Sequence, residues 1–327
     1  MKSRFSIFLR IAVSIGLVAL LIWGMRDKFP NVIATLTKTN LFMFLLAILL
    51  FAFNIAVLLS LRLKLLFDGE MLQIPFGKVS QLSFIGYFFN NFMPTAVGGD
   101  IVKAYYVNKH TGQTAKSFIS VFMDRFIGLF TFMCIAALAI AVSWSNIDFV
   151  LRKFILIFVV CGIGLFIVIL NDFIAKIILN FLSKFKLWNI GDRLSKIYRA
   201  VHEYKNKKGL IISAMIISTL AQSLYFLTVY ILARALNVNI LMKTVFLLMP
   251  IVSVISMLPS IGGLGLREGA IVAFFGPVIG SGDSLSVSIL LLAMLLVISI
   301  LGAVIYVSAS QFRIKRTEIS KIEAYQV

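Results

Sequence analysis

The sequence has 327 residues, of which 61% are hydrophobic and only 13% charged, about half the charged fraction of a soluble globular chain. The formal net charge is +18, and the basic residues stand between apolar runs, which is typical of a membrane protein that contacts anionic lipid headgroups. This composition excludes a soluble catalytic domain, and a basic patch for nucleic acid is not expected either.

Six apolar runs are long enough to cross the hydrocarbon core, which takes about 20 residues. The predicted spans are residues 5–24, 41–61, 117–144, 154–171, 209–233 and 285–310. The first run ends at Trp23-Gly24-Met25-Arg26, without the small-residue pattern of a cleavage site, so we expect a retained anchor. The sequence therefore predicts an all-α, polytopic integral membrane protein with one transmembrane domain over residues 1–327.

Two further apolar stretches, 79–110 and 244–280, are interrupted near their middle. The polar, Pro and Gly residues at the two breaks are Asn90, Asn91, Pro94, Gly98, Gly99 and Asp100 in the first, and Pro259, Gly262, Gly263, Gly265, Arg267 and Glu268 in the second. Unwound backbone is tolerated at membrane depth only where protein or water surrounds it. Each stretch must also return the chain to the side of the membrane from which it entered, so that the flanking loops stay on the sides that their charges indicate. We therefore expect two re-entrant or broken helical hairpins whose turns contain these Pro and Gly residues.

The loop charges predict the orientation. Residues 172–208 and the C-terminal tail are rich in Lys and Arg, whereas the loops 25–40, 145–153 and 234–243 are not, so both termini should be cytoplasmic in the cell membrane. The hairpins then enter from opposite sides, as in the inverted repeats of transporters. The 172–208 loop alternates apolar and basic residues, which indicates an interfacial amphipathic helix or a site for a protein partner.

Three segments carry a resemblance to a known family. NNFMPTAVGGDIVKAYYV (90–107), SVFMDRFIGL (120–129) and LPSIGGLGLREGA (258–270) resemble the flippase-like transmembrane region of lysylphosphatidylglycerol synthetases and its stand-alone relatives. Lys103 stands where the family usually has Arg. The resemblance implies movement of a lipid or lipid-linked headgroup between leaflets. Fused relatives add a soluble lysyltransferase domain; these 327 residues contain no polar stretch of that size, so we expect no enzyme activity.

Asp124 and Arg125 lie about 10 Å into a predicted span, where a charge is costly unless it is paired or faces water. Adjacent residues point about 100° apart on a helix, so each needs a partner elsewhere, and we expect the first hairpin to supply it. The alternative is that Arg125 snorkels to the interface while Asp124 forms a structural ion pair.

Lys103 lies three residues after Asp100 on one helix face, beside the first break. A phosphate could take Lys103 and free backbone N–H groups while Asp100 restrains Lys103 or carries a proton; alternatively Asp100 only caps the helix 101–107. At the second break, the Arg267 fork suits a phosphate, and Glu268 would be stabilised in a first helical turn. The remaining polar side chains in apolar runs bind a ligand or join helices, and they are Asn90, Asn91, Gln222 and Tyr225.

The leading hypothesis is a flippase or scramblase for an anionic, phosphate-bearing lipid. Its predicted binding residues are Lys103, Arg125, Arg267, Asn90 and Asn91, with Asp100, Asp124 and Glu268 as coupling or ion-pair residues. One alternative is a membrane subunit that recruits a glycosyltransferase or lipid-modifying enzyme through 172–208. Another is an intramembrane enzyme acting on a lipid phosphate, which the lack of a metal-binding pattern disfavours. No Walker A sequence is present, and no cofactor or metal is expected.

Overall fold

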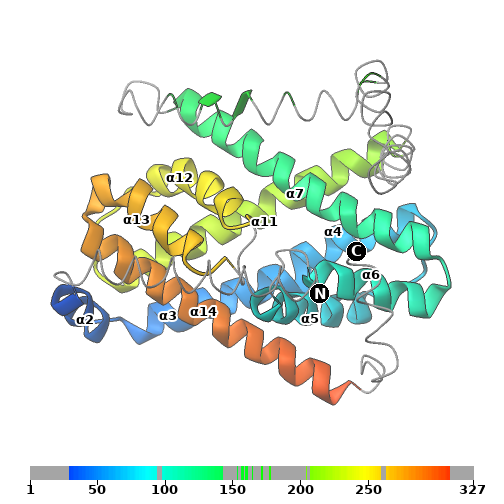
Figure 1. Cartoon of the computed structure of the whole chain (residues 1–327), viewed down its shortest axis with the longest axis horizontal. Helices are drawn as coiled ribbons and strands as arrows, with labels where there is room; N and C mark the ends of the chain where they lie inside the picture. Colours follow the sequence, from blue (N-terminus) through cyan, green and yellow to red (C-terminus); the bar gives the residue numbers. More distant parts are fainter. Residues whose placement is uncertain are drawn as a thin grey trace, which may run out of the picture.

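The computed structural model describes residues 29–93, 98–142, 207–258 and 263–309, together with isolated positions between 153 and 204. Within these ranges the chain is helical and has no strand, which confirms the predicted class (Figure 1). The elements are α2 (Phe29–Thr37), α3 (Leu41–Phe53), the π-helical η2 (Asn54–Leu59), α4 (Ser60–Gly69), α5 (Phe76–Phe92), α6 (Gly98–Thr111), α7 (Thr114–Val142), α11 (Lys208–Ala235), α12 (Met242–Ile255), α13 (Leu266–Ile279) and α14 (Ser281–Ser308). Span 5–24 and most of 154–171 and 172–208 lie outside the described residues.

Four of the described helices are long and apolar enough to cross a membrane. They are Leu41–Gly69, Thr114–Ala139, Lys208–Ala235 and Ser281–Ser308, and they correspond to the predicted spans 41–61, 117–144, 209–233 and 285–310. At about 1.5 Å per residue each exceeds the roughly 30 Å hydrocarbon core. The chain is therefore a multi-pass membrane protein, in line with its composition.

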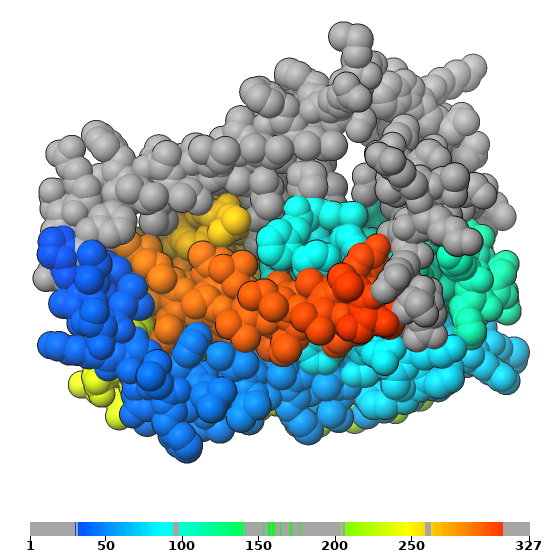
Figure 2. All heavy atoms as spheres, turned by 90° about the horizontal axis from the view of Figure 1, so that it is seen from below, coloured from blue at the N-terminus to red at the C-terminus, as the bar shows by residue number. Residues whose placement is uncertain are grey.

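The outer surface of this bundle is apolar. Figure 2 shows α14 as a band running along one face beside α3 and α5. Its exposed large side chains are Leu296, Val297, Ile300, Leu301, Val304 and Val307. In water such a continuous apolar stripe would be costly, whereas lipid tails solvate it without penalty.

The Leu41–Gly69 helix differs from its prediction. It continues eight residues beyond the predicted end at 61, because the charges that follow are paired: Lys64 binds Asp68 one turn on, and Arg62 has a partner described below. It also contains the π-helical turn η2, which the apolar sequence NIAVLL did not reveal.

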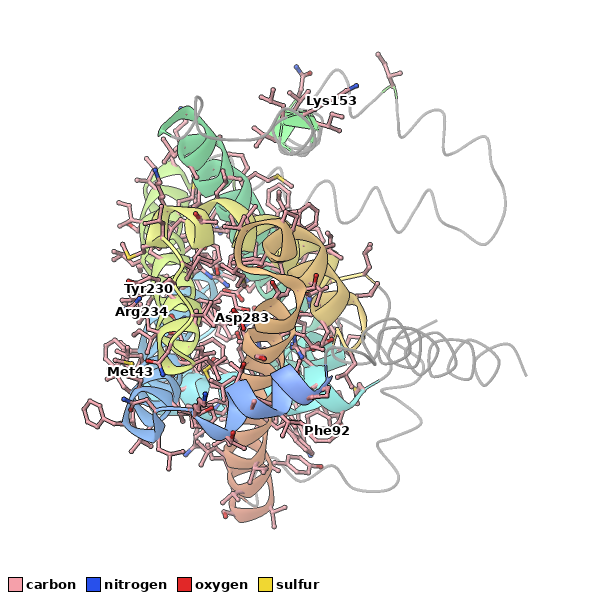
Figure 3. The ribbon with its side chains drawn as sticks, turned by 90° about the vertical axis from the view of Figure 1, so that its left-hand side faces the viewer. Met43, Phe92, Lys153, Tyr230, Arg234 and Asp283 are labelled. Carbon is pink, nitrogen blue, oxygen red and sulfur yellow. The ribbon has the colours of Figure 1, made fainter. Side chains whose placement is uncertain are left out.

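The predicted loop 25–40 contains the short helix α2, which lies across one end of the bundle against α14, near Asp283 in Figure 3.

The two interrupted stretches each form two helical arms around a break. In the first, α5 and α6 pack together, and Asn90 Oδ1 of α5 accepts a hydrogen bond from Gly99 N of α6 at 2.8 Å. In the second, the chain leaves α12 and enters α13 through Gly263 and Gly265, whose φ angles of +79° and +80° favour glycine. Gly98 and Gly99 begin α6, and Gly99 has no positive φ, whereas Pro94, Pro259 and Gly262 lie outside the described residues.

The hairpins pack toward opposite ends of the Leu41–Gly69 helix (Figure 1). Phe51 and Ile55 share one apolar core with α12 and α13, whereas Leu63 and Phe67 share another with α5 and α6. The middle of the helix, where the π turn lies, therefore faces the space between the two hairpins.

Candidate functional site

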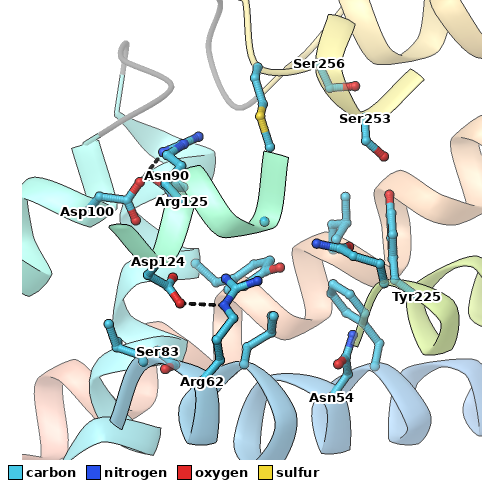
Figure 4. A pocket seen from close by; sticks show the side chains of 18 of the residues that line it. Asn54, Arg62, Ser83, Asn90, Asp100, Asp124, Arg125, Tyr225, Ser253 and Ser256 are labelled. Atoms are coloured by element: carbon cyan, nitrogen blue, oxygen red, sulfur yellow. Dashed lines mark hydrogen bonds and ion pairs between the residues drawn. The ribbon is translucent and has the colours of Figure 1, made fainter. Parts of the chain in front are cut away.

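A cavity of about 260 Å³ lies between the hairpins and is lined by every long helix described (Figure 4). Its apolar wall includes Phe51, Leu63, Phe132 and Leu295. Its polar and charged lining is Asn54, Arg62, Ser83, Tyr87, Asn90, Asn91, Asp100, Lys103, Asp124, Arg125, Gln222, Tyr225, Ser253, Ser256 and Arg267. So many ionisable groups inside an apolar bundle mark a functional site by default.

Asp100 holds two of the basic residues. Its Oδ1 lies 3.3 Å from Lys103 Nζ on the same helix, and its Oδ2 binds Arg125 Nη1 of α7. The carboxylate is thus shared between one cation of its own hairpin and one of the neighbouring span. Asp100 does not cap α6, because its oxygens bind these side chains and Asn90 supplies the capping oxygen. The expected hairpin partner for Arg125 is therefore Asp100.

The partner of Asp124 was predicted wrongly. It is Arg62 of α4 and not the first hairpin: Arg62 Nε lies 2.6 Å from Asp124 Oδ1, and Arg62 Nη1 donates to Ser218 Oγ of α11 at 2.8 Å. Gly128, one turn after Asp124, makes room for the guanidinium, since a Cβ there would lie 3.2 Å from Arg62 Nη1. Both charged side chains are almost fully buried. Breaking such a pair by removing one partner costs about 3–5 kcal/mol.

At the second hairpin, Arg267 and Glu268 begin α13 and pair with each other. Glu268 Oε1 accepts from Arg267 Nη2 at 2.6 Å and from Nε at 3.1 Å, while Oε2 accepts from Gly265 N at 2.7 Å. Glu268 therefore caps the helix and fixes the arginine at once. Arg267 is 5% exposed and still lines the cavity, with Nη1 outside these bonds.

The cavity carries an excess of positive charge. Four basic residues line it, namely Arg62, Lys103, Arg125 and Arg267, against the carboxylates of Asp100 and Asp124. When Glu268, which binds Arg267, is also counted, one positive charge is left uncompensated among the described residues. A buried charge without a counter-ion is expensive, so this lining favours an anionic ligand.

All five predicted binding residues line this one cavity, as do two of the three predicted coupling residues. The two asparagines among these residues make hydrogen bonds within the protein. Asn90 fixes the α6 N-terminus, and Asn91 Nδ2 binds Ser299 Oγ of α14, so both asparagines join helices. Gln222 and Tyr225 also line the cavity. In the described part of the chain, no group of three or more His, Cys, Asp or Glu could hold a metal ion.

Six polar lining residues were not identified from the sequence: Asn54, Arg62, Ser83, Tyr87, Ser253 and Ser256. Asn54 carried a usable signal, because it is the only strongly polar residue between 41 and 59. Arg62 also carried a signal, because it directly follows the predicted span 41–61. The helix continues through this residue to Gly69. Ser83 and Tyr87 lie one turn apart on α5, on the face toward the cavity.

Comparison with known proteins identifies the family of this chain. Residues 7–318 match the family described as the lysylphosphatidylglycerol synthase TM region. The chain is also similar to the UPF0104 membrane protein PH1989 of Pyrococcus horikoshii, with 25% identity over 315 residues, covering 87% of this chain and 91% of that protein. The family match covers both hairpins and every helix that lines the cavity. The protein belongs to the lysylphosphatidylglycerol synthase transmembrane-region family.

Proposed function

We propose that this protein moves an anionic, phosphate-bearing lipid or lipid-linked headgroup between membrane leaflets, with the acyl or prenyl tails left in the bilayer. The observation that supports it most directly is the net positive cavity between two broken helical hairpins in an apolar bundle. Broken helices with polar residues between them are the usual substrate sites of transporters.

The cavity retains donors for a phosphate. Lys103 has three N–H donors, of which Asp100 takes one, and Arg267 offers Nη1 beside its bonds to Glu268. A guanidinium binds phosphate through paired N–H groups, and an ammonium binds it as a point charge. A headgroup phosphate would therefore be held between the first and the second hairpin.

Movement requires the site to open to each leaflet in turn. The hairpins pack on opposite ends of the Leu41–Gly69 helix, which supports an inverted arrangement in which each hairpin gates one side. An incoming phosphate competes with Asp100 for Lys103 and Arg125, which loosens the contact between α6 and α7. The carboxylates Asp100, Asp124 and Glu268 are the candidates for coupling to an ion gradient.

Leaflet-resolved transport by the purified protein in liposomes tests the proposal. Acyl-labelled phosphatidylglycerol and phosphatidylcholine are compared, and a membrane-impermeant reductant quenches only label in the outer leaflet. We expect the protein to make inner-leaflet phosphatidylglycerol accessible much faster than phosphatidylcholine. Protein-free and protein-containing liposomes with identical kinetics would rule out the proposed function.

A matched pair of variants links that rate to the cavity. Lys103→Met keeps the apolar part of the side chain and removes one positive charge from the cavity. The transport rate should therefore fall about 10–100-fold, which corresponds to the free energy of one hydrogen bond to a charged group. Lys64→Met removes a lysine from a partly exposed position outside the cavity and should leave the rate unchanged.

A further inference from the structure

A second cavity, of about 210 Å³, lies at the base of the first hairpin, where α5 begins and α6 ends. It shares no lining residue with the cavity between the hairpins. Three basic side chains line it: Lys78 from the first turn of α5, and Lys109 and His110 from the last turn of α6. Basic residues therefore reach this second cavity from both arms of the hairpin, and the proposed transport does not use them.

The rest of the wall of this second cavity is largely apolar and lies deeper. Its residues are buried members of the core that joins the two arms, namely Ile74, Leu82, Tyr106 and Val107. Leu82 lies one turn beyond Lys78 on α5, which runs inward from the base of the hairpin. Tyr106 lies one turn before His110 on α6, which runs back outward. Four residues of helix are about 6 Å. The second cavity is thus apolar inside and basic at its mouth, which matches an amphiphile with an anionic head.

The first hairpin itself has little negative charge. Its only acidic residue is Asp100, which lines the other cavity and binds two basic residues there. The acidic residues ahead of the hairpin, Asp68 and Glu70, are paired with lysines outside the second cavity. Within the described part of the chain, neither Lys78 nor His110 forms an ion pair. Like charges on two packed helices repel, so this arrangement favours an anion between them.

We propose that the second cavity binds the phosphate of an anionic lipid, which is held at the base of the hairpin and is not the transported molecule. The phosphate bridges Lys78 of α5 to Lys109 and His110 of α6, and an acyl chain covers the apolar wall. Basic pockets between membrane helices typically bind anionic lipid headgroups. A lipid bound there ties together the outer ends of two arms whose inner ends carry Asn90 and Lys103 into the other cavity. The proposal does not depend on transport.

Quenching of a tryptophan by brominated lipid measures occupancy at the second cavity alone. Lys109 and His110 are exposed, so a lipid held there exchanges with the bilayer and is measured by titration. Phe76 begins α5 two residues before Lys78 and is 40% exposed. Phe76→Trp, in a background with the 3 native tryptophans changed to Phe, therefore gives a reporter protein with its probe beside the site.

Nanodiscs of phosphatidylcholine that contain the reporter protein are titrated with brominated phosphatidic acid or with brominated phosphatidylcholine. One basic side chain near the membrane surface changes the affinity for an anionic lipid about 5-fold. With three such side chains, we expect phosphatidic acid to bind about 10-fold or more tightly than phosphatidylcholine. Equal quenching by the two lipids would overturn the proposal.

Two matched variants separate a site from diffuse attraction. Lys78→Met should lower the preference for phosphatidic acid about 5-fold, whereas Lys116→Met, at an exposed position of α7 outside the second cavity, should leave it unchanged. An equal loss in both variants also overturns the proposal. Inorganic phosphate should not displace the lipid, because it leaves the apolar wall uncovered; displacement would assign the second cavity to a free phosphate instead. Since the reporter senses only the base of the hairpin, lipid binding there without transport refutes only the proposed function.

Discussion

Gly99 is the position where the first hairpin tolerates least added volume. A Cβ on Gly99 would lie 2.8 Å from Asn90 Cγ and closer still to the backbone carbonyl of Gly86, whereas ordinary contacts begin at 3.4 Å. The obstruction includes backbone, so no rotamer change relieves it. Gly99→Ala therefore has to separate α5 from α6 and to weaken the bond from Gly99 N to Asn90 Oδ1.

The cost of this substitution combines two effects. Overpacking costs about 1–3 kcal/mol and a lost hydrogen bond about 1 kcal/mol, so we expect a loss of roughly 2–4 kcal/mol and a melting temperature several degrees lower in detergent. Transport should fall as well, because Asp100 follows Gly99 directly and positions two cavity cations.

The control is Gly77→Ala on the same hairpin, where a Cβ meets nothing within 4 Å. It should be neutral or slightly stabilising, since a helix gains from losing Gly. If Gly99→Ala matches Gly77→Ala in both melting temperature and transport rate, the arms of the hairpin do not pack as closely as described.

Three further predictions concern charge and topology. Arg125→Ala should abolish transport yet insert and express normally, because its partner Asp100 keeps Lys103 as a second basic neighbour. Full transport activity of this variant in liposomes would mean that Arg125 only anchors its helix at the membrane interface. Asp124→Ala should instead destabilise the protein by about 3–5 kcal/mol, because Arg62 stays buried without its counter-ion; an unchanged melting temperature would contradict the buried pair. In a cysteine-free background, an impermeant thiol reagent added outside should label Ser145→Cys but not Ser183→Cys, and strong external labelling at 183 would reverse the topology.

The sequence predicted the parts of this fold that depend on composition. Apolar length identified the four described spans, and paired Pro/Gly breaks identified both hairpins. The divergence of adjacent side chains on a helix predicted that Asp124 and Arg125 need separate partners, and the expected partner in the first hairpin was right for Arg125 but wrong for Asp124. These inferences work because lipid imposes strict rules on backbone and charge.

Other features depend on tertiary contacts that no local pattern encodes. Arg62 directly follows the predicted span 41–61 and was given no role from the sequence, because only the packing of α4 against α7 brings it to Asp124. The π turn has the composition of an ordinary α-helix, so its position could not be predicted. The orientation of the Asn54 amide, whose Nδ2 donates to Ala221 O of α11, is likewise a property of packing alone.

The central claim is that an anionic lipid headgroup occupies the cavity. Native mass spectrometry of the protein purified from its membrane, followed by identification of the released lipid, measures this most directly. We predict a retained phosphate-bearing anionic lipid in the wild-type protein, much reduced in Lys103→Met and unchanged in Lys64→Met. Retention of only zwitterionic lipid, or equal retention of anionic lipid in wild type and Lys103→Met, would contradict an anion site between the hairpins.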